Sequence, residues 1–284
     1  MLTELCFLIK ITFMIELVGK IGSMALIDKA NGDIDYNKFA NLGRQLKPGM
    51  IWISSGAVEI GRIDYIRRTG IELPPEDNHT KANYAAQGQA ILMQMYRNFI
   101  NPQYGIRQFL VEHNHFNNEK KSIHIKKLLE AAVSQNCVPI VNYNDAVSCE
   151  ELRKFEIGIL SKKKQSVLEL VDNDETASQI ACLVKAKTLL ILSTLDGIYE
   201  DINSSSSLLR EISAPNFEEL SKKLDEVKLK CLGASRAGAN GAKYKLEYIK
   251  PCLAQGTRVI IASAKYNIDD IIAERVPSTM IWVK

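Results

Sequence analysis

Short apolar runs alternate with segments of helical periodicity along most of the chain, which predicts an α/β fold. The apolar runs are rich in Val, Ile and Leu, as expected of fully buried strands. Strands are predicted at residues 15–18, 50–53, 106–111, 137–141, 188–192, 258–263 and 279–283. Helices are predicted at residues 33–46, 80–100, 121–135 and 176–185. We expect the strands to form one continuous sheet.

Two polar clusters follow apolar runs in the middle of the chain. Asn142 and Asp145 lie in the cluster after the strand predicted at 137–141, and residues 172–174 (Asp-Asn-Asp) form the second cluster. In open α/β sheets, ligands bind at the carboxyl ends of the strands. Either cluster alone is explained by a turn, because Asn and Asp form Asx turns readily. Two such clusters, in a chain with Gly-rich segments elsewhere, favour a ligand site.

Two glycine-containing segments near the amino terminus suit anion binding. Lys20 lies between Gly19 and Gly22, and we predict that it sits on a glycine turn outside the core, where backbone N–H groups and one lysine can approach a phosphate. Ser55-Gly56 follows a predicted strand and precedes a helix, where hydroxyl and N–H groups can bind a carboxylate or phosphate. A helix N-cap without a ligand explains Ser55 equally well.

The second half of the chain contains a further candidate anion site. Ser193-Thr194 follows the strand predicted at 188–192, and a Gly/Ala-rich segment at 233–243 ends in Lys243 and opens a helix. Small residues with a basic end can cradle phosphates or form a flexible connection, and the sequence leaves both open. Residues 148–166 are rich in charge and poor in apolar pattern, so we predict a mobile loop that covers the site.

Composition narrows the class of protein. The 284 residues are 46% hydrophobic with a net charge of +3, which allows a large core and gives no argument for nucleic-acid binding. Six cysteines form no Cys-x-x-Cys pair and the histidines show no zinc signature, so we expect reduced thiols, a cytoplasmic protein and no histidine metal site. The apolar residues 1–14 lack the features of an export signal, no stretch reaches the length of a membrane helix, and Met14 is an alternative start to Met1.

The order of the motifs resembles that of the amino acid kinase family. Five segments carry the resemblance, in the family's order, between about residues 15 and 262. They are Lys20-Ile21-Gly22-Ser23, Ser54-Ser55-Gly56-Ala57-Val58, residues 81–89 with Ala85-Ala86-Gln87-Gly88-Gln89, residues 138–147, and Asp172-Asn173-Asp174. Tyr143, Thr194 and Asn240 depart from the family pattern, which has glutamate, aspartate and methionine at these positions.

The resemblance implies a three-layer αβα sandwich with a mainly parallel central sheet. A single domain would occupy residues 15–284 after an extension at 1–14, with the acceptor bound by about 15–175 and the nucleotide by about 176–284. The implied activity is transfer of the γ-phosphoryl group of ATP, with Mg²⁺, to the side-chain carboxylate of L-glutamate, the first step of proline biosynthesis. The resemblance also implies a homo-oligomer coupled to a glutamyl-phosphate reductase, in a short form without the family's RNA-binding-like C-terminal domain.

The resemblance also implies roles for individual residues. The catalytic residues would be Lys20, Lys243, Asp172 and Asp174. The acceptor would be bound by Ser55, Gly56, Asn142, Asp145 and Asn173. The nucleotide would be bound by Lys20, Ser193, Thr194, Arg236, Gly238, Asn240, Gly241 and Lys243. No residue is assigned directly to a metal.

Two alternative functions stay open. One is a kinase of the same fold that acts on another acid, such as acetylglutamate or aspartate, and the other is a catalytically silent relative that binds nucleotide. A carboxylate acceptor agrees with the chemistry of the chain, because a carboxylate is already ionised at neutral pH and needs no general base. Phosphoryl transfer depends instead on positioning and positive charge.

Overall fold

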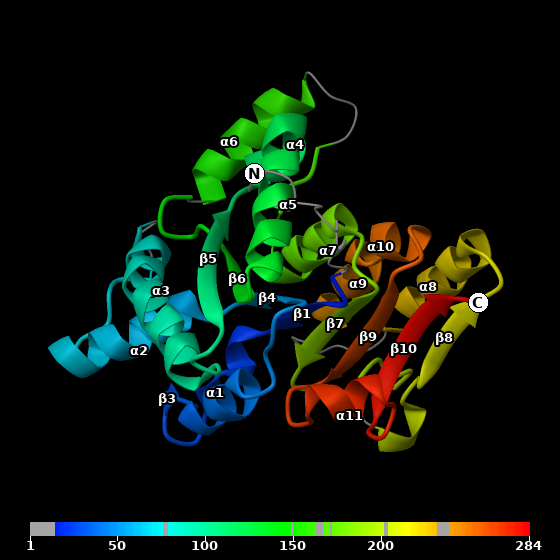
Figure 1. Ribbon diagram of the computed structural model, residues 1–284, viewed down its shortest axis with the longest axis horizontal. Helices are drawn as coiled ribbons and strands as arrows, with labels where there is room; N and C mark the ends of the chain where they lie inside the picture. Colours follow the sequence, from blue (N-terminus) through cyan, green and yellow to red (C-terminus); the bar gives the residue numbers. More distant parts are fainter. Residues whose placement is uncertain are drawn as a thin grey trace, which may run out of the picture.

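The central element of the fold is a mixed β-sheet. The computed structural model describes residues 15–75, 79–148, 150–162, 167–170, 172–201, 204–231 and 239–284. The strands within these residues are β1 (Leu17–Ile21), β2 (Ile27–Asp28), β3 (Asp33–Ile34), β4 (Met50–Ser54), β5 (Gly105–Val111), β6 (Cys137–Tyr143), β7 (Thr188–Ser193), β8 (Glu211–Ala214), β9 (Arg258–Ser263) and β10 (Ser278–Val283). β2 and β3 form a hairpin, and the other eight form one sheet in the order β5-β6-β4-β1-β7-β9-β10-β8 (Figure 1). The expectation that the apolar strands join in one sheet is confirmed, and β8 is an addition that the sequence pattern does not predict.

Six neighbouring strands of the sheet, from β5 to β9, run parallel to one another. β10 is antiparallel to β9, and β8 is parallel to β10. The carboxyl ends of β1, β4, β6 and β7 therefore lie at the same edge of the sheet. The topology gathers the polar residues that follow these strands at that edge, where ligands of α/β proteins bind.

Helices cover both faces of the sheet. They are α1 (Tyr36–Gly43), α2 (Ala57–Thr69), α3 (Thr80–Phe99), α4 (His113–Asn117), α5 (Glu119–Ser134), α6 (Glu150–Ser161), α7 (Asn173–Val184), α8 (Phe217–Cys231), α9 (Ala239–Tyr248), α10 (Lys250–Ala254) and α11 (Ile268–Ile272). Side chains of α5, α7, α8, α9 and α10 pack with Val18 in one hydrophobic cluster, and those of α1, α2, α3 and α11 pack with Leu17 in the other. Adjacent strand residues point to opposite faces, so β1 contributes to both clusters. The predicted three-layer αβα sandwich is confirmed (Figure 1).

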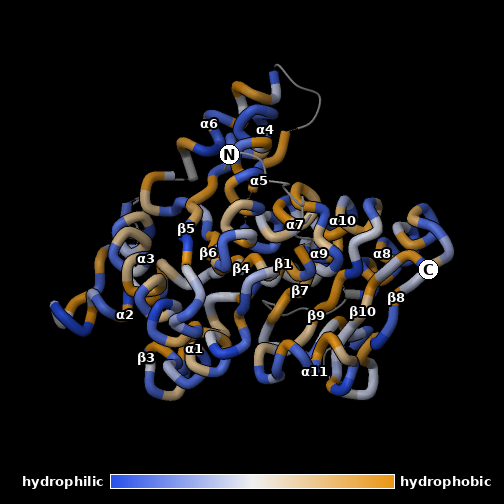
Figure 2. Tube along the Cα trace, in the orientation of Figure 1, coloured by the Kyte–Doolittle hydropathy of each residue, from blue (hydrophilic) through white to orange (hydrophobic). Residues whose placement is uncertain are grey.

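Hydrophobic residues are concentrated in the sheet. β1, β4 and β6 are buried along their whole length, and Figure 2 shows hydrophobic colour on the central strands and much hydrophilic colour on the outer helices. A strand that is covered by helices on both sides has no polar face, which accounts for apolar runs without alternation. The buried Trp52 donates a hydrogen bond of 3.1 Å to Tyr96 Oη and so links β4 to α3. None of the helices in the described ranges is long and apolar enough to cross a membrane.

Two glycines allow α2 and α3 to cross in close contact. A Cβ atom at Gly88 would lie 1.8 Å from the carbonyl oxygen of Ala57, and a Cβ atom at Gly61 would lie 1.8 Å from that of Tyr84. No side chain fits at either position, because the neighbouring atom belongs to the backbone of the other helix. The small residues of the segment 80–100 predict such a crossing, which the structure confirms.

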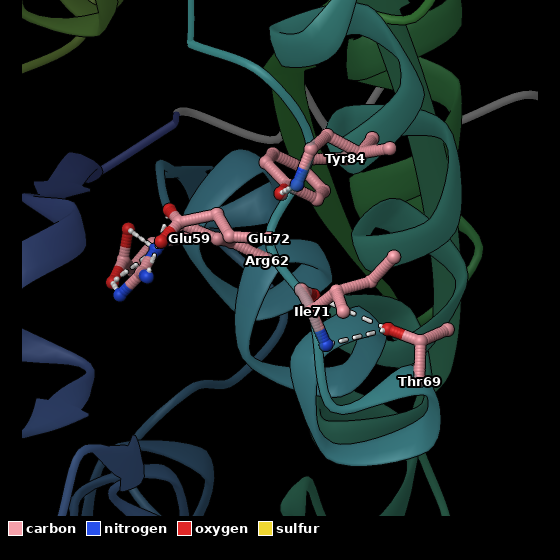
Figure 3. Close-up of polar contacts among 7 residues, drawn as sticks. Glu59, Arg62, Thr69, Ile71, Glu72 and Tyr84 are labelled. Carbon is pink, nitrogen blue, oxygen red and sulfur yellow. Dashed lines mark hydrogen bonds and ion pairs between the residues drawn. The ribbon is translucent and has the colours of Figure 1, made fainter.

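A polar cluster holds the segment that connects α2 to α3. Arg62 contacts Glu59 on its own helix at 2.8 Å and Glu72 in the connecting segment at 3.1 Å (Figure 3). Tyr84 Oη of α3 accepts a hydrogen bond of 2.7 Å from the backbone N–H of Leu73. These contacts anchor the connecting segment to both helices.

Residues 148–166 differ most from the elements that the sequence predicts. The segment contains α6, so the prediction of a loop is wrong. Leu152, Phe155 and Ile159 have helical spacing, but their side chains are exposed rather than packed in the core. α6 stands beyond the carboxyl edge of the sheet, next to α4 (Figure 1). The helical spacing of these apolar residues is the signal for a helix in the segment, whereas its many charged residues favour a loop.

Candidate active site

Lys20 lies inside β1, so the prediction that it sits on a glycine turn is wrong. It is 8% exposed and is flanked by Ile53 of β4 and Ile191 of β7 in the sheet. The neighbouring Gly19 is required by packing, because a Cβ atom there would lie 2.1 Å from the ring of Trp52. A lysine at such a buried position requires a partner of opposite charge.

The partner of Lys20 is Asp174, in the first turn of α7. Lys20 Nζ lies 2.6 Å from Asp174 Oδ1, and Lys245 Nζ of α9 lies 2.8 Å from Asp174 Oδ2. Burial acts to raise the pKa of Asp174, but the two ammonium groups outweigh it and hold the pKa below its ordinary value. Asp172 caps α7 by accepting hydrogen bonds from the N–H groups of Asp174, at 2.7 Å, and Glu175, at 3.0 Å. An ionised Asp174 thus holds two lysines from distant parts of the sequence at one point.

The second lysine of this cluster is Lys245, whereas the sequence pattern favours Lys243 as the lysine that binds phosphate. Two positions that differ by two residues are rotated by about 200° around a helix, so the two side chains face different directions. Both lysines follow the same Gly/Ala-rich segment, and the pattern does not separate them. Lys245 is the lysine that reaches Asp174, and the role of Lys243 stays a prediction.

A pocket with a volume of about 290 Å³ lies beside the cluster of Lys20, Asp174 and Lys245. Six of the residues that line it are predicted site residues: Lys20, Ser55, Asp145, Asp172, Asn173 and Asp174. The others are Gly22, Ser23, Tyr143 and Arg153. The lining is strongly polar and the volume suits a small molecule.

Amide side chains connect β6, α3 and α7 beside this pocket. Asn173 Nδ2 donates hydrogen bonds to Ser55 Oγ at 3.1 Å and to Asn142 Oδ1 at 3.0 Å, while Asn142 Nδ2 donates to Gln89 Oε1 at 2.9 Å. The donors of the Asn173 amide are therefore engaged. Its buried Oδ1 has no hydrogen-bond partner among the described residues. This oxygen can accept a hydrogen bond from a ligand.

Asp145 contributes a carboxyl group to the same pocket. Burial raises its pKa to about 6, although the positive charges of Arg153 and Lys81 act in the opposite direction. The neighbouring Tyr143 is also buried; burial raises its pKa, and its Oη lies 3.0 Å from Ser148 Oγ. Ionising a buried carboxyl group is costly without a close counter-charge, so the position of Asp145 suits a cationic group of a ligand.

α6 brings Arg153 to the pocket. Arg153 Nη1 donates a hydrogen bond of 3.3 Å to the carbonyl oxygen of Leu170. α6 is held next to α4 by a contact of 3.1 Å between Glu156 Oε2 and Nε2 of the buried His113. Arg153 is absent from the predicted site because it belongs to the segment that the sequence pattern indicates to be a loop.

Three further predicted residues lie at the carboxyl ends of β4 and β7. Gly56 precedes α2 and has a φ angle of 111°, which favours glycine. Ser193 ends β7, where its Oγ accepts a hydrogen bond of 3.0 Å from the N–H of Leu195, and Thr194 follows directly. β4 and β7 both flank β1, so these residues lie at the edge that holds Lys20.

The remaining predicted nucleotide residues belong to the Gly/Ala-rich segment. Asn240 and Gly241 lie in the first turn of α9. Arg236 and Gly238 lie outside the described residues. The roles of all four stay predictions.

Comparison with known proteins identifies the family. The profile of the amino acid kinase family matches residues 16–263. The chain belongs to the amino acid kinase family. It is 27% identical over 262 residues to a glutamate 5-kinase of Clostridium perfringens, and the match covers 88% of each of the two chains. It is 28% identical over 267 residues to a glutamate 5-kinase of Dehalococcoides mccartyi, which covers 90% of this chain and 64% of that protein.

Solved structures of other kinases share the fold of this amino acid kinase. The TM-score is 0.57 with carbamate kinase from Giardia lamblia bound to AMP-PNP, at 16% identity and with coverage of 94% of this chain and 98% of that chain. The TM-score with UMP kinase from Ureaplasma parvum is 0.54, at 13% identity, and the match covers 94% of this chain and 97% of that chain. These similarities show the fold, while family membership makes the chain a kinase that uses ATP.

Magnesium is expected with ATP, and an ion held by the protein would need several oxygen ligands from acidic side chains. The described part of the chain contains no group of three His, Cys, Asp or Glu residues that could hold a metal ion. Asp174 is engaged by two lysines, and Asp172 caps α7. These residues do not form a magnesium site of their own, whereas Mg²⁺ in kinases is held largely through substrate phosphates.

Proposed function

We propose that this amino acid kinase transfers the γ-phosphoryl group of ATP to the side-chain carboxylate of L-glutamate. The observation that carries the proposal is a single pocket that combines Lys20 with Asp145 and the unpartnered Oδ1 of Asn173. An amino dicarboxylic acid offers a carboxylate to the lysine and an ammonium group to the two acceptors. The similarity to glutamate 5-kinases supports the same acceptor.

In the proposed reaction, an oxygen of the acceptor carboxylate forms a bond to the γ-phosphorus. The bond between that phosphorus and the β–γ bridging oxygen breaks, and ADP leaves with the electron pair. No residue has to remove a proton, because the carboxylate is ionised near neutral pH. Lys20 and Lys245 stabilise the negative charge of the transferred group, and Asp174 keeps both lysines in place. Mg²⁺ bound to the ATP phosphates would supply additional positive charge.

The nucleotide is proposed to bind next to Lys245, between the carboxyl end of β7 and the start of α9. Ser193 and Thr194 follow β7, and α9 begins at Ala239. Parallel strands and helix N-termini at this edge suit phosphate groups. The division into acceptor and nucleotide parts, the homo-oligomer and the coupling to a reductase stay predictions from the family resemblance.

A hydroxylamine-trapping assay tests the acceptor, because hydroxylamine converts an acyl phosphate to a hydroxamate. We expect ADP release and hydroxamate with L-glutamate, and lower turnover of N-acetylglutamate by on the order of 100-fold, because acetylation removes the charge that faces Asp145. L-Aspartate tests the length of the acceptor in parallel, and the Lys245→Ala variant controls for contaminating kinases. A preference for N-acetylglutamate, or no hydroxamate from any of the three acids, would contradict the proposal.

A further inference from the structure

We infer that Arg153 binds the carboxylate of the acceptor that is not phosphorylated. This role rests on the proposed function and adds to it the orientation of the acceptor in the pocket. It also gives α6 a function, since the helix would supply a substrate-binding residue from outside the sheet.

Arg153 is a cation that has no carboxylate partner in the described part of the pocket. Lys20, the other cation of the lining, contacts Asp174 at 2.6 Å. Among the described residues, Arg153 donates one hydrogen bond, to the carbonyl oxygen of Leu170, and other N–H groups of the guanidinium are left available there. A guanidinium can bind a carboxylate through two parallel hydrogen bonds. The pocket thus offers a carboxylate-binding group that the described residues do not occupy.

One contact of Arg153 itself and one contact of α6 hold Arg153 in position. Leu170 is 1% exposed and has a φ angle of 47°, a left-handed conformation that costs a leucine conformational energy. The carbonyl oxygen of this residue accepts the hydrogen bond from Arg153. One turn further along α6, Glu156 contacts the buried His113 at 3.1 Å. Backbone strain that is retained beside a pocket is typical of residues that position a ligand-binding group.

The charges of the pocket select one orientation of the acceptor. The carboxylate that reacts has to lie near Lys20, where phosphoryl transfer is proposed. The α-carbon of an amino acid carries an ammonium and a carboxylate together, and Asp145 and Arg153 offer the two opposite charges close to each other. Both side chains line the same pocket. The α-carbon would therefore lie between Asp145 and Arg153, with the side chain directed to Lys20.

The test compares two ligands that differ only at the α-carboxylate. In L-isoglutamine this carboxylate is an uncharged amide, while the ammonium group and the side-chain carboxylate are kept. Binding of L-glutamate and L-isoglutamine is measured by calorimetry without ATP, and turnover by hydroxamate formation. The variants are Arg153→Gln and Lys154→Gln, which removes the same charge from an exposed neighbour on α6. Thermal unfolding verifies that both variants remain folded.

We expect Arg153→Gln to weaken L-glutamate binding by on the order of 10- to 100-fold and L-isoglutamine binding by less than about threefold. The preference for L-glutamate would then shrink, with kcat at saturating substrate nearly unchanged, because Arg153 would not contact the transferred group. Lys154→Gln should leave both affinities unchanged.

Equal loss of both ligands in Arg153→Gln, or no loss of either, would overturn the inference. A wild-type protein that shows Arg153-dependent binding of L-glutamate but forms no hydroxamate would leave the inference in place and refute the proposed reaction. If the protein forms hydroxamate but Arg153→Gln keeps the full preference for L-glutamate, the proposed reaction stands and the inference about Arg153 is refuted. A wild-type protein that binds neither ligand would refute both.

Discussion

The Oδ1 atom of Asp174 lies 2.6 Å from the Nζ atom of Lys20, and both residues are buried. The members of this ion pair are not equivalent, because Asp174 also contacts Lys245 through its other oxygen. Loss of Lys20 leaves the carboxylate of Asp174 with one ammonium partner. Loss of Asp174 leaves the ammonium group of Lys20 buried without the carboxylate that it contacts.

Asp174→Asn should therefore reduce the free energy of unfolding more than Lys20→Met does. A buried charge that loses its partner costs about 3–5 kcal/mol, and we expect a loss of this size for Asp174→Asn. Lys20→Met keeps the length of the side chain and the contact of Asp174 with Lys245, so its loss should be clearly smaller. Urea unfolding at pH 7 measures both values. The opposite order would mean that the two lysines do not depend on Asp174.

Lys245→Ala should reduce kcat by on the order of 100- to 1000-fold, as expected when one group that stabilises transition-state charge is removed. Lys243→Ala should lose far less activity, because Lys245 is the residue that contacts Asp174. Steady-state release of ADP with L-glutamate as acceptor compares the two variants. Equal losses, or a larger loss for Lys243→Ala, would support the predicted catalytic role of Lys243.

Asp145→Asn should stabilise the protein at neutral pH and abolish recognition of the ammonium group. The pKa of Asp145 is raised to about 6 in the folded protein, against about 3.9 in an unfolded chain. The folded state binds this proton more tightly, so the stability from the protonated form is complete below about pH 4 and is lost as the pH rises through 6.

The stability gain of Asp145→Asn should consequently grow between pH 4 and pH 6 and level off above, to at most about 3 kcal/mol, because each pKa unit corresponds to about 1.4 kcal/mol. Urea unfolding of the wild type and the variant across this range measures the difference. A gain that does not change with pH would mean that Asp145 keeps an ordinary pKa.

Gly88→Ala should disrupt the crossing of α2 and α3. Its Cβ atom would lie 1.8 Å from the carbonyl oxygen of Ala57, which belongs to rigid backbone. We expect a loss of about 3 kcal/mol or more in the free energy of unfolding, at the upper end for overpacked sites. Gly158→Ala is the matched control, because a Cβ atom at this helical position meets nothing within 4 Å. The control should raise stability by up to about 1 kcal/mol, since alanine favours helix.

The buried strands could be predicted from the sequence because helices cover the sheet on both faces. β4 and β6, for example, are continuous apolar runs, and the polar groups Ser55 and Asp145 follow their ends. The position of Lys20 could not be predicted in the same way. Its burial depends on Asp174, more than 150 residues away, and local sequence indicates only that glycines surround it.

Two further features of the site depend on helices whose orientation or position local sequence does not contain. The choice between Lys243 and Lys245 depends on the rotation of α9 relative to Asp174, which no local pattern contains. Arg153 is not among the predicted site residues because the charged residues of its segment favour a loop. The spacing of Leu152, Phe155 and Ile159 was the available signal for a helix in this segment.

Under the proposed function, the shared carboxylate of Asp174 would link the affinities for two different ligands. Lys20 belongs to the part of the chain that is predicted to bind the acceptor, and Lys245 to the part that is predicted to bind the nucleotide. A nucleotide that draws Lys245 away from Asp174 would leave the charge of the carboxylate less compensated and so strengthen its attraction to Lys20, which is proposed to face the acceptor. The resulting coupling free energy has to be reciprocal. The factor by which ATP changes the dissociation constant of the acceptor must therefore equal the factor by which the acceptor changes that of ATP.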